Sequence, residues 1–310
     1  MIQILRSSSS GLEELQTFEI GSWIHLVNPT QAELEQVKEA VGVREDLLYA
    51  ALDENETARF ESAEGQSLVL VDVPVKTDLD IAYYETIPFG IIMMKSYIIT
   101  VSLMDLQLVG RFLGKPVKGF YTQFKTRFVL QMLYEISSQY LHNLRVLEKI
   151  STAVETKMLK AQRNDDLIDM LKVEKSLVYF QTSLRSNQLV LDRLLRAEHI
   201  KNYPEDQELL DDVIIENKQA IEMTNLYFNI LTGTMDAYAS MISNNQNDVM
   251  KILTVVTMLM AIPTIISGFF GMNVPVPLDE LGDVAFWLIL AVTVVVGLIA
   301  AWLFKKLRML

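Results

Sequence analysis

The sequence of 310 residues contains no cysteine. This absence excludes disulfide bonds, thiolate ligands for zinc or iron–sulfur clusters, and cysteine nucleophiles. Basic residues are also scarce, with 27 Lys and Arg against 39 Asp and Glu and a formal net charge of -12. Because nucleic-acid surfaces need clustered positive charge, this balance excludes a broad nucleic-acid-binding face. The apolar share of 50% excludes a disordered chain.

Charged side chains are missing from two long stretches near the C-terminus. The apolar runs Ile252–Phe270 and Val284–Phe304 are 19 and 21 residues long. A helix needs roughly 20 apolar residues to cross a bilayer, so each run is long enough. Trp287 and Trp302 lie near the two ends of the second run, where interfacial aromatics are found. We therefore predict two transmembrane helices rather than two buried core helices.

The basic residues predict the orientation of these helices. The connecting segment Gly271–Asp283 has three acidic residues and no Lys or Arg, whereas the tail carries Lys305, Lys306 and Arg308. Basic segments stay on the cytoplasmic side, so we expect the loop outside and both termini in the cytoplasm. The predicted location is the cell (inner) membrane, as a multi-pass protein. The acidic cytoplasmic part suggests an interaction with cations.

Residues 1–120 are predicted to form an α/β domain, a mixed sheet with helical cover. Thr30 and Glu33 have the spacing of a capping box, which would begin a helix over Gln31–Val41. Three apolar or β-branched runs indicate strands, the last two joined as a hairpin at Lys95-Ser96: Leu68–Val75, Ile87–Met94 and Tyr97–Val101.

Residues 121–250 are predicted to form a helical stalk, followed by a transmembrane hairpin over residues 251–310. Its helices are expected at about 251–270 and 284–304, with the outer loop at 271–283. Helical patterns in the stalk cover Phe124–Leu159, Asp165–Arg196 and Asp206–Met250. No breaker separates the last of these from the first apolar run, so residues 206–270 could form one helix of roughly 100 Å. Apolar residues on this helix follow coiled-coil-like steps of four and three: Leu209, Val213, Ala220, Met223, Tyr227, Ile230, Ala237 and Met241.

A second line on the same helix, the polar stripe, is made of small or polar residues apart from one Met. It comprises Asp236, Ser240, Ser243, Asn247, Met250, Thr254, Thr257, Ala261, Thr264, Gly268 and Gly271. Small residues allow close packing of membrane helices, which is one interpretation. Polar groups at membrane depth also mark water-filled paths, and the acid and amide at the cytoplasmic end favour this second interpretation. Because one hairpin cannot enclose a pore, a path requires symmetric assembly.

The tripeptide Gly271-Met272-Asn273 follows the first apolar run, and a short acidic loop, a second span and a basic tail come after it. This arrangement resembles the CorA family of magnesium channels, whose signature is Gly-Met-Asn at the outer pore mouth. The resemblance extends over the whole chain. The segment from Trp23 to Thr30 resembles an early family motif, and the segment from Asn247 to Thr254 matches the family where the chain enters the membrane.

The resemblance implies a homopentameric funnel that conducts Mg²⁺ passively, driven by the membrane potential and gated by intracellular Mg²⁺. Gly271, Met272 and Asn273 would form the selectivity entrance, with Asn273 supplying a ring of amide carbonyls. Met250 and Leu253 would form the hydrophobic constriction. The remaining pore-lining residues implied are Asp236, Asn247, Thr254, Thr257, Ala261, Thr264 and Gly268.

The family also senses intracellular Mg²⁺ between neighbouring cytoplasmic domains. By the same resemblance, Asp78 and Asp212 fall at the sensing positions, and Asp80 and Asp211 could share the task. The alternative for these four acids is that they are ordinary solvated side chains. Mg²⁺ is thus expected both as the transported and as the regulatory ion.

Two departures from the family pattern stand out: His25 replaces an acid often found in the early segment, and the outer loop is longer than usual.

The nearest alternative function is transport of Zn²⁺, Co²⁺ or Ni²⁺ by a relative in the same superfamily. These metals favour imidazole or thiolate ligands, and the three histidines are scattered. A second alternative is a membrane-anchored coiled-coil scaffold without a pore. No nucleophile–base pair stands out, so an enzyme is not expected.

Overall fold

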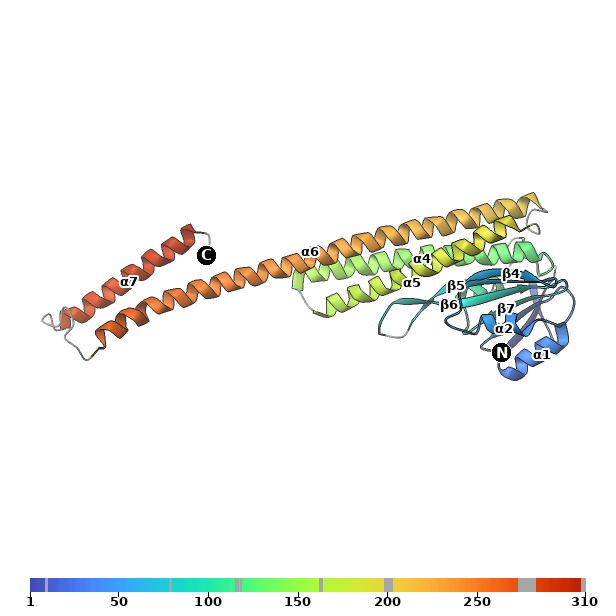
Figure 1. The fold of residues 1–310 in the computed structure, drawn as a ribbon, viewed down its shortest axis with the longest axis horizontal. Helices are drawn as coiled ribbons and strands as arrows, with labels where there is room; N and C mark the ends of the chain where they lie inside the picture. Colours follow the sequence, from blue (N-terminus) through green and yellow to red (C-terminus); the bar gives the residue numbers. More distant parts are fainter. Residues whose placement is uncertain are drawn as a thin grey trace. The chain divides into compact units, whose positions relative to one another are not determined.

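The computed structural model describes residues 1–8, 11–77, 80–114, 117, 119–161, 164–197, 203–272 and 283–307. The chain forms two compact units, Met1–Gly233 and Thr234–Leu310. The first unit holds the sheet and most of the helices, and the second holds the two long apolar helical segments (Figure 1).

The first unit is built on a seven-stranded mixed sheet with the order β2-β1-β3-β7-β6-β5-β4. Neighbouring strands are antiparallel except β3 and β7, which are parallel. The predicted hairpin at Lys95-Ser96 is confirmed as the turn between β6 and β7. The strands are β1 (Ile2–Ser8), β2 (Gly11–Leu15), β3 (Trp23–Val27), β4 (Arg59–Ala63), β5 (Gln66–Lys76), β6 (Tyr84–Met93) and β7 (Ile98–Ser102).

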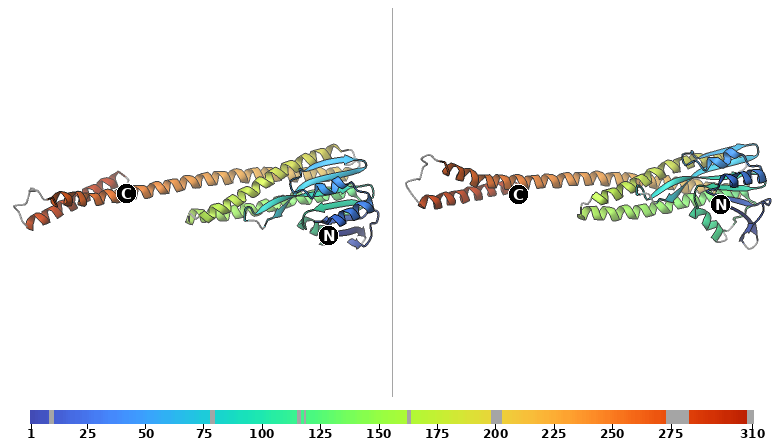
Figure 2. Two further views of the ribbon diagram at one scale, coloured as in Figure 1. Left: turned by 60° about the horizontal axis from the view of Figure 1, so that its bottom comes forward. Right: turned by 90° about the horizontal axis from the view of Figure 1, so that it is seen from below.

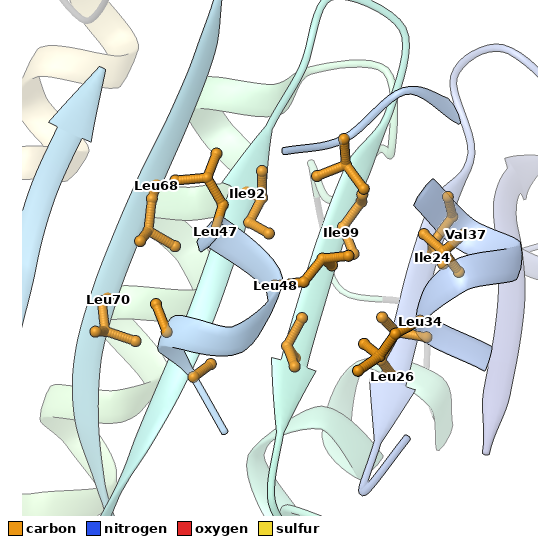
Figure 3. Packing of buried hydrophobic residues seen from close by; sticks show 14 residues of the cluster. Ile24, Leu26, Leu34, Val37, Leu47, Leu48, Leu68, Leu70, Ile92 and Ile99 are labelled. Atoms are coloured by element: carbon orange, nitrogen blue, oxygen red, sulfur yellow. The ribbon is translucent and has the colours of Figure 1, made fainter. Parts of the chain in front are cut away.

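One face of the sheet is covered by two short helices, α1 (Gln31–Val41) and α2 (Glu45–Ala50). The predicted capping box is confirmed: the Thr30 side chain accepts a hydrogen bond from the Glu33 backbone N–H, and the Glu33 carboxylate accepts one from the Thr30 N–H. Figure 3 shows the resulting core, in which leucines of α1 and α2 point toward aliphatic side chains of four strands. Its labelled members are Ile24, Leu26, Leu34, Val37, Leu47, Leu48, Leu68, Leu70, Ile92 and Ile99.

The opposite face is covered by long helices, α4 (Lys125–Ala161) and α5 (Asn164–Arg196), with the short α3 (Gln107–Gly114) against α4 (Figures 1 and 2). Trp23, fully buried on β3, packs edge-on against Phe120 and Phe128, with ring centres 6.0 and 5.1 Å away. The sheet is therefore buried on both faces, which explains why its central strands are almost continuously apolar.

Helix α5 also closes the open edge of β5. Strand β4 pairs with β5 only as far as Leu70, so the next outward-facing backbone groups, those of Asp72, have no strand partner there. The side-chain amide of Asn187 takes that place: its Oδ1 accepts from the Asp72 N–H at 2.9 Å, and its Nδ2 donates to the Asp72 C=O at 2.8 Å. The Tyr140 hydroxyl donates to the same carbonyl at 3.1 Å. These bonds satisfy buried backbone groups that would otherwise destabilise the sheet.

The third long helix, α6 (Pro204–Phe270), spans 67 residues, which confirms the prediction of one continuous helix. The breaks predicted before it and between α4 and α5 are confirmed as well. Within the first unit, the Asn225 side chain accepts a hydrogen bond from Gln181, and that of Asn217 donates to Gln188 and to the Leu184 C=O. Helices α5 and α6 therefore run antiparallel.

The coiled-coil-like line predicted on α6 is buried at Val213 and Ala220 and exposed at Ile230 and Ala237. Its other members are half-buried: Leu209, Met223, Tyr227 and Met241. The Ile230 side chain is 54% exposed, and Ala237 is exposed too. Polar residues on the buried line explain the difference, because their hydrogen bonds are satisfied: Thr224 donates to the Ala220 C=O at 2.7 Å. Counting apolar residues alone therefore missed the polar members Asn217 and Thr224 of the buried line. The line actually buried is Leu210, Val213, Asn217, Ala220, Thr224 and Leu231.

The second unit consists of the rest of α6 and helix α7 (Asp283–Lys306). Each of these two helices contains one of the two apolar runs expected to cross a membrane. Residues 273–282 of the predicted outer loop lie outside the described part of the chain.

Candidate functional site

Two helices in the described part of the chain are long and apolar enough to span a membrane. The apolar windows of α6 and α7 have mean hydropathies of 2.1 and 2.7, and only 6% and 0% of their residues are buried within the chain. Side chains such as Met260 and Leu298 are 71% and 65% exposed. A core helix of a soluble protein would be covered, so these faces need lipid or other subunits around them.

The polar stripe lies on the part of α6 that belongs to the second unit. Of its predicted pore-lining residues, only Thr254 is half-buried within the chain, and the others are exposed. Met250 and Leu253, the predicted constriction, are each 56% exposed. The exposed residues among those predicted to line the pore are Asp236, Asn247, Met250, Leu253, Thr257, Ala261, Thr264 and Gly268.

The stripe is on the side of α6 that the other described residues leave largely exposed. Along the apolar segment, Val255 is buried, and Leu259, Ile262 and Ile266 are half-buried, as is Thr254 of the stripe. With 3.6 residues per turn, this apolar line lies roughly 160° around the helix from the stripe. The polar face is consequently free to meet the same face of other copies.

Hydroxyl groups on the stripe direct their hydrogens back into the helix. The hydroxyls of Thr254 and Thr257 donate to the carbonyls of Met250 and Leu253 at 2.8 Å, and the Thr264 hydroxyl donates to Met260 at 3.0 Å. Ser240 likewise donates to Asp236. The oxygens keep their lone pairs for outside partners, so these positions offer acceptors, which suit the hydrogens of a hydrated cation.

The entrance tripeptide begins where α6 ends at Phe270. The Gly271 N–H donates to the Ser267 C=O at 2.9 Å, and Met272 is 52% exposed. A Cβ at Gly271 would lie 3.2 Å from that same carbonyl oxygen, a close contact that favours glycine. Asn273 lies outside the described residues.

Three of the four predicted sensing acids are described, and all three are exposed. Asp211 and Asp212 are adjacent on α6. The Asp80 carboxylate forms an ion pair with the Lys172 ammonium of α5, which raises the pKa of Lys172. Asp78 lies outside the described residues, and no cluster of three or more potential metal ligands occurs among the described ones.

The structure does not bring Asp80 and Asp212 together within one chain. Asp80 contacts α5 at Lys172, whereas Asn217, five residues after Asp212, contacts α5 at Gln188. Since α5 and α6 are antiparallel, the two acids lie at levels on the order of 30 Å apart along α5, at 1.5 Å per residue. A site that uses both would need acids from different chains.

The whole-chain comparison decides the family. Residues 19–306 match the sequence model of the family described as CorA-like Mg2+ transporter protein. The chain belongs to the CorA family. Its members are transporters, and the mixed sheet, the long helix and the two C-terminal membrane helices found here are the CorA architecture.

The cobalt/magnesium transport protein CorA of Methanocaldococcus jannaschii is 31% identical over 294 residues, which cover 92% of this chain and 90% of the relative. The magnesium transport protein CorA of Wolinella succinogenes is 23% identical over 99% of this chain and 97% of its own length. The complete structure of the M. jannaschii CorA magnesium transporter superposes with a TM-score of 0.85, at 28% identity, over 99% of this chain and 98% of that one. The CorA resemblance inferred from the sequence is therefore confirmed.

Two side-chain contacts at the candidate sites of this CorA chain were not predicted from its sequence. The ion pair of Asp80 with Lys172 joins residues 92 positions apart, and no local pattern indicates it. The return of the threonine hydroxyls to their own helix was predictable in principle, since Thr in a membrane helix commonly bonds the carbonyl four residues earlier.

Proposed function

We propose that this protein is a magnesium channel that mediates passive Mg²⁺ uptake driven by the membrane potential. The observation that carries the proposal is the polar stripe: it continues along α6 through the apolar segment, it is uncovered, and it presents oxygen acceptors. The CorA relatives named for magnesium or cobalt/magnesium transport support the ion class.

The proposed assembly is a homopentamer in which five copies of α6 enclose the path and α7 faces lipid. The exposed stripe and the nearly opposite apolar line on α6 support this arrangement, because each polar face would then meet its symmetry mates. The α/β domains would form the wide mouth of a funnel in the cytoplasm, with both termini on that side. The acidic loop and the basic tail support this orientation.

Asn273 is proposed to form the entrance together with Gly271 and Met272. Mg²⁺ gives up its water reluctantly, so a ring of amide carbonyls that holds first-shell waters suits it better than a carboxylate cage. Two charges moving through the field gain roughly 4.6 kcal/mol for each 100 mV, which is enough to drive uptake without ATP.

Met250 and Leu253 are proposed to form the gate. Met250 is the one large apolar residue of the polar stripe, Leu253 follows it three residues later on α6, and each is 56% exposed within the chain. Rings of such side chains can close a path by dewetting. Asn247 and Asp236 then line the exit toward the cytoplasm.

Regulation is proposed to come from intracellular Mg²⁺ bound between subunits by Asp78 and Asp212, with Asp80 and Asp211 as neighbours. The separation of Asp80 and Asp212 within one chain supports a shared site, because only acids of different chains could meet. Bound Mg²⁺ would bridge carboxylates that otherwise repel, and its loss would loosen the closed ring.

Transport of Co²⁺, Zn²⁺ or Ni²⁺ is the second candidate, and the name of the M. jannaschii relative favours Co²⁺ among them. The stripe offers oxygen ligands and no imidazole, which favours Mg²⁺.

The test is ion uptake into proteoliposomes under an inside-negative potential, with the native protein beside Asn273→Ala and Asn245→Ala. Asn245 lies on the opposite side of α6 from the stripe and serves as the matched amide control. We expect Mg²⁺ uptake in the native protein and the control and its loss in Asn273→Ala. Uptake of Zn²⁺ or Co²⁺ without Mg²⁺ would overturn the assignment of Mg²⁺ as the transported ion. No uptake of any cation would favour the membrane-anchored scaffold without a pore.

A further inference from the structure

A cavity of about 270 Å³ opens in the first unit, outside every residue assigned to the ion path or to Mg²⁺ sensing. It lies where β4, the end of β6, the start of α4 and the end of α5 meet. Most of its wall is apolar, from Phe60, Met93, Met94, Val129, Leu130, Leu194 and Ala197. The Ser62 and Ser67 hydroxyls, which also line it, bond each other at 2.8 Å.

The charged groups of this cavity are all of one sign. Lys95 and Lys125 line it, and no Asp or Glu is among its described lining residues. In a chain with 39 acidic and 27 basic residues, such a pair without an acid is unusual. No ion pair between described residues includes either lysine, and the Lys125 ammonium donates instead to the Lys95 backbone carbonyl.

Burial leaves one of these charges poorly solvated. Lys125 is half-buried, and this burial lowers its pKa below the ordinary value. A cation held beside apolar walls gains more from an added anion than a fully hydrated one does, because the interaction is screened less.

We propose that this cavity binds a small carboxylate with an apolar body, such as an aromatic or short aliphatic acid. The carboxylate would pair with Lys125 at the start of α4 and with Lys95 in the turn between β6 and β7, and the apolar body would contact the Met, Leu and Phe side chains of the wall. Such a site resembles typical small-molecule pockets, which are mostly apolar with a few polar groups that orient the ligand. It would give the CorA domain a ligand other than a metal ion.

The test is binding of para-trifluoromethylbenzoate to the full-length protein in detergent, with the binding measured by fluorine NMR. Lys125→Met removes the charge and keeps the apolar stem, and Ala197→Phe fills the cavity from its rim while both lysines stay. Lys149→Met, at an exposed position on the same helix, is the matched control. Circular dichroism melting verifies that every variant is folded.

We expect saturable binding to the native protein and to Lys149→Met. Binding should weaken roughly tenfold or more in Lys125→Met, since a charge-assisted hydrogen bond is lost, and it should also weaken in Ala197→Phe. The neutral analogue, para-trifluoromethylbenzamide, should bind less well than the benzoate. No saturable binding, equal binding by Lys125→Met and Lys149→Met, or equal binding of the amide would each overturn the proposal.

Discussion

Among single residues, His25 makes the sheet sensitive to acid. Its ring is only 1% exposed, its Nδ1 lies 2.8 Å from the Thr100 hydroxyl, and Trp23 donates to that same hydroxyl at 2.7 Å. The ring Nε2 is buried without a hydrogen-bond partner among the described residues. Burial lowers the pKa of His25 from 6.5 to about 4, although the nearby Asp105 carboxylate opposes the shift.

The folded protein should lose stability as the pH falls from 6.5 toward 4. In this range the unfolded chain protonates His25 and the folded chain does not, so the contribution present above pH 6.5 is lost on acidification. A shift of this size corresponds to about 3 kcal/mol. Urea unfolding of the native protein and of His25→Gln between pH 7 and pH 4 measures this loss of unfolding free energy. Parallel pH profiles for the two proteins would contradict the assignment.

Gly90 is a second residue whose identity the structure explains. It lies in the middle of β6, and a Cβ there would be 2.8 Å from the Cβ of Ala51, which follows α2. The absent side chain is therefore what allows α2 to approach the sheet this closely.

Gly90→Ala should lower the free energy of unfolding by roughly 1–3 kcal/mol, the usual cost of overpacking. Ala51→Gly in the same chain should recover part of that loss, because it removes the other member of the contact. Chemical unfolding of both single variants and of the double variant tests this as a thermodynamic cycle. Strictly additive effects would show that the contact is not the cause.

Between elements, one side chain secures α5 to the sheet. Asn187 is 4% exposed and bonds both backbone groups of Asp72, so it acts where another strand would otherwise pair. The neighbouring Ser183 hydroxyl bonds the Thr86 hydroxyl at 2.8 Å, and Ser176 accepts from the Tyr83 and Tyr84 N–H groups. Polar residues at these positions therefore pair the helix with strand edges.

Asn187→Leu should destabilise the protein by roughly 1–3 kcal/mol, because the Asp72 N–H would be left without its acceptor. The Asp72 carbonyl would keep the Tyr140 hydroxyl as a donor. Leu189→Asn, on the same helix at a 64% exposed position, is the control and should be close to neutral. Thermal melting compares them, and equal effects of the two substitutions would refute the special role of Asn187.

At the scale of the whole molecule, the main observation is that a single chain leaves its membrane segments and its polar stripe largely exposed. The membrane segments of α6 and α7 are mostly exposed, and every described residue of the polar stripe except the half-buried Thr254 is exposed. Asp80 and Asp212, two of the proposed sensing acids, are likewise too far apart within one chain to share an ion. The proposed path and the proposed regulatory site would therefore both be completed by assembly.

Asp212→Ala should weaken closure of the channel by millimolar intracellular Mg²⁺, since one of the bridging carboxylates would be lost. Glu208→Ala removes an exposed acid one turn earlier on α6 and should leave Mg²⁺ inhibition as in the native protein. Currents recorded from excised patches at stepped Mg²⁺ concentrations test this. Unchanged inhibition in Asp212→Ala would remove the residue from the sensing site.

Local chemistry was sufficient to predict several elements. The capping box at Thr30 and Glu33, the hairpin at Lys95-Ser96 and the continuous helix α6 each depend on neighbouring residues, which is why the sequence indicated them. Hydropathy and charge predicted the two membrane helices in the same way. The tripeptide Gly271-Met272-Asn273 indicated the CorA family because its position relative to those helices is visible along the chain.

Contacts between distant residues needed the tertiary structure. The buried line on α6 includes Asn217, whose partners lie on α5, so no apolar pattern could identify it. The pairing of Asp80 with Lys172 and the capping of Asp72 by Asn187 also join residues far apart in sequence. Sequence by itself thus determined the strands β5, β6 and β7, the helix α1, the three long helices and the membrane spans, because those depend on local propensity and hydropathy. Strands β1 to β4 and the short helices α2 and α3 were not predicted, and the structure shows them. Only the fold decided which polar groups are buried with partners and which face outward, because that depends on packing between elements.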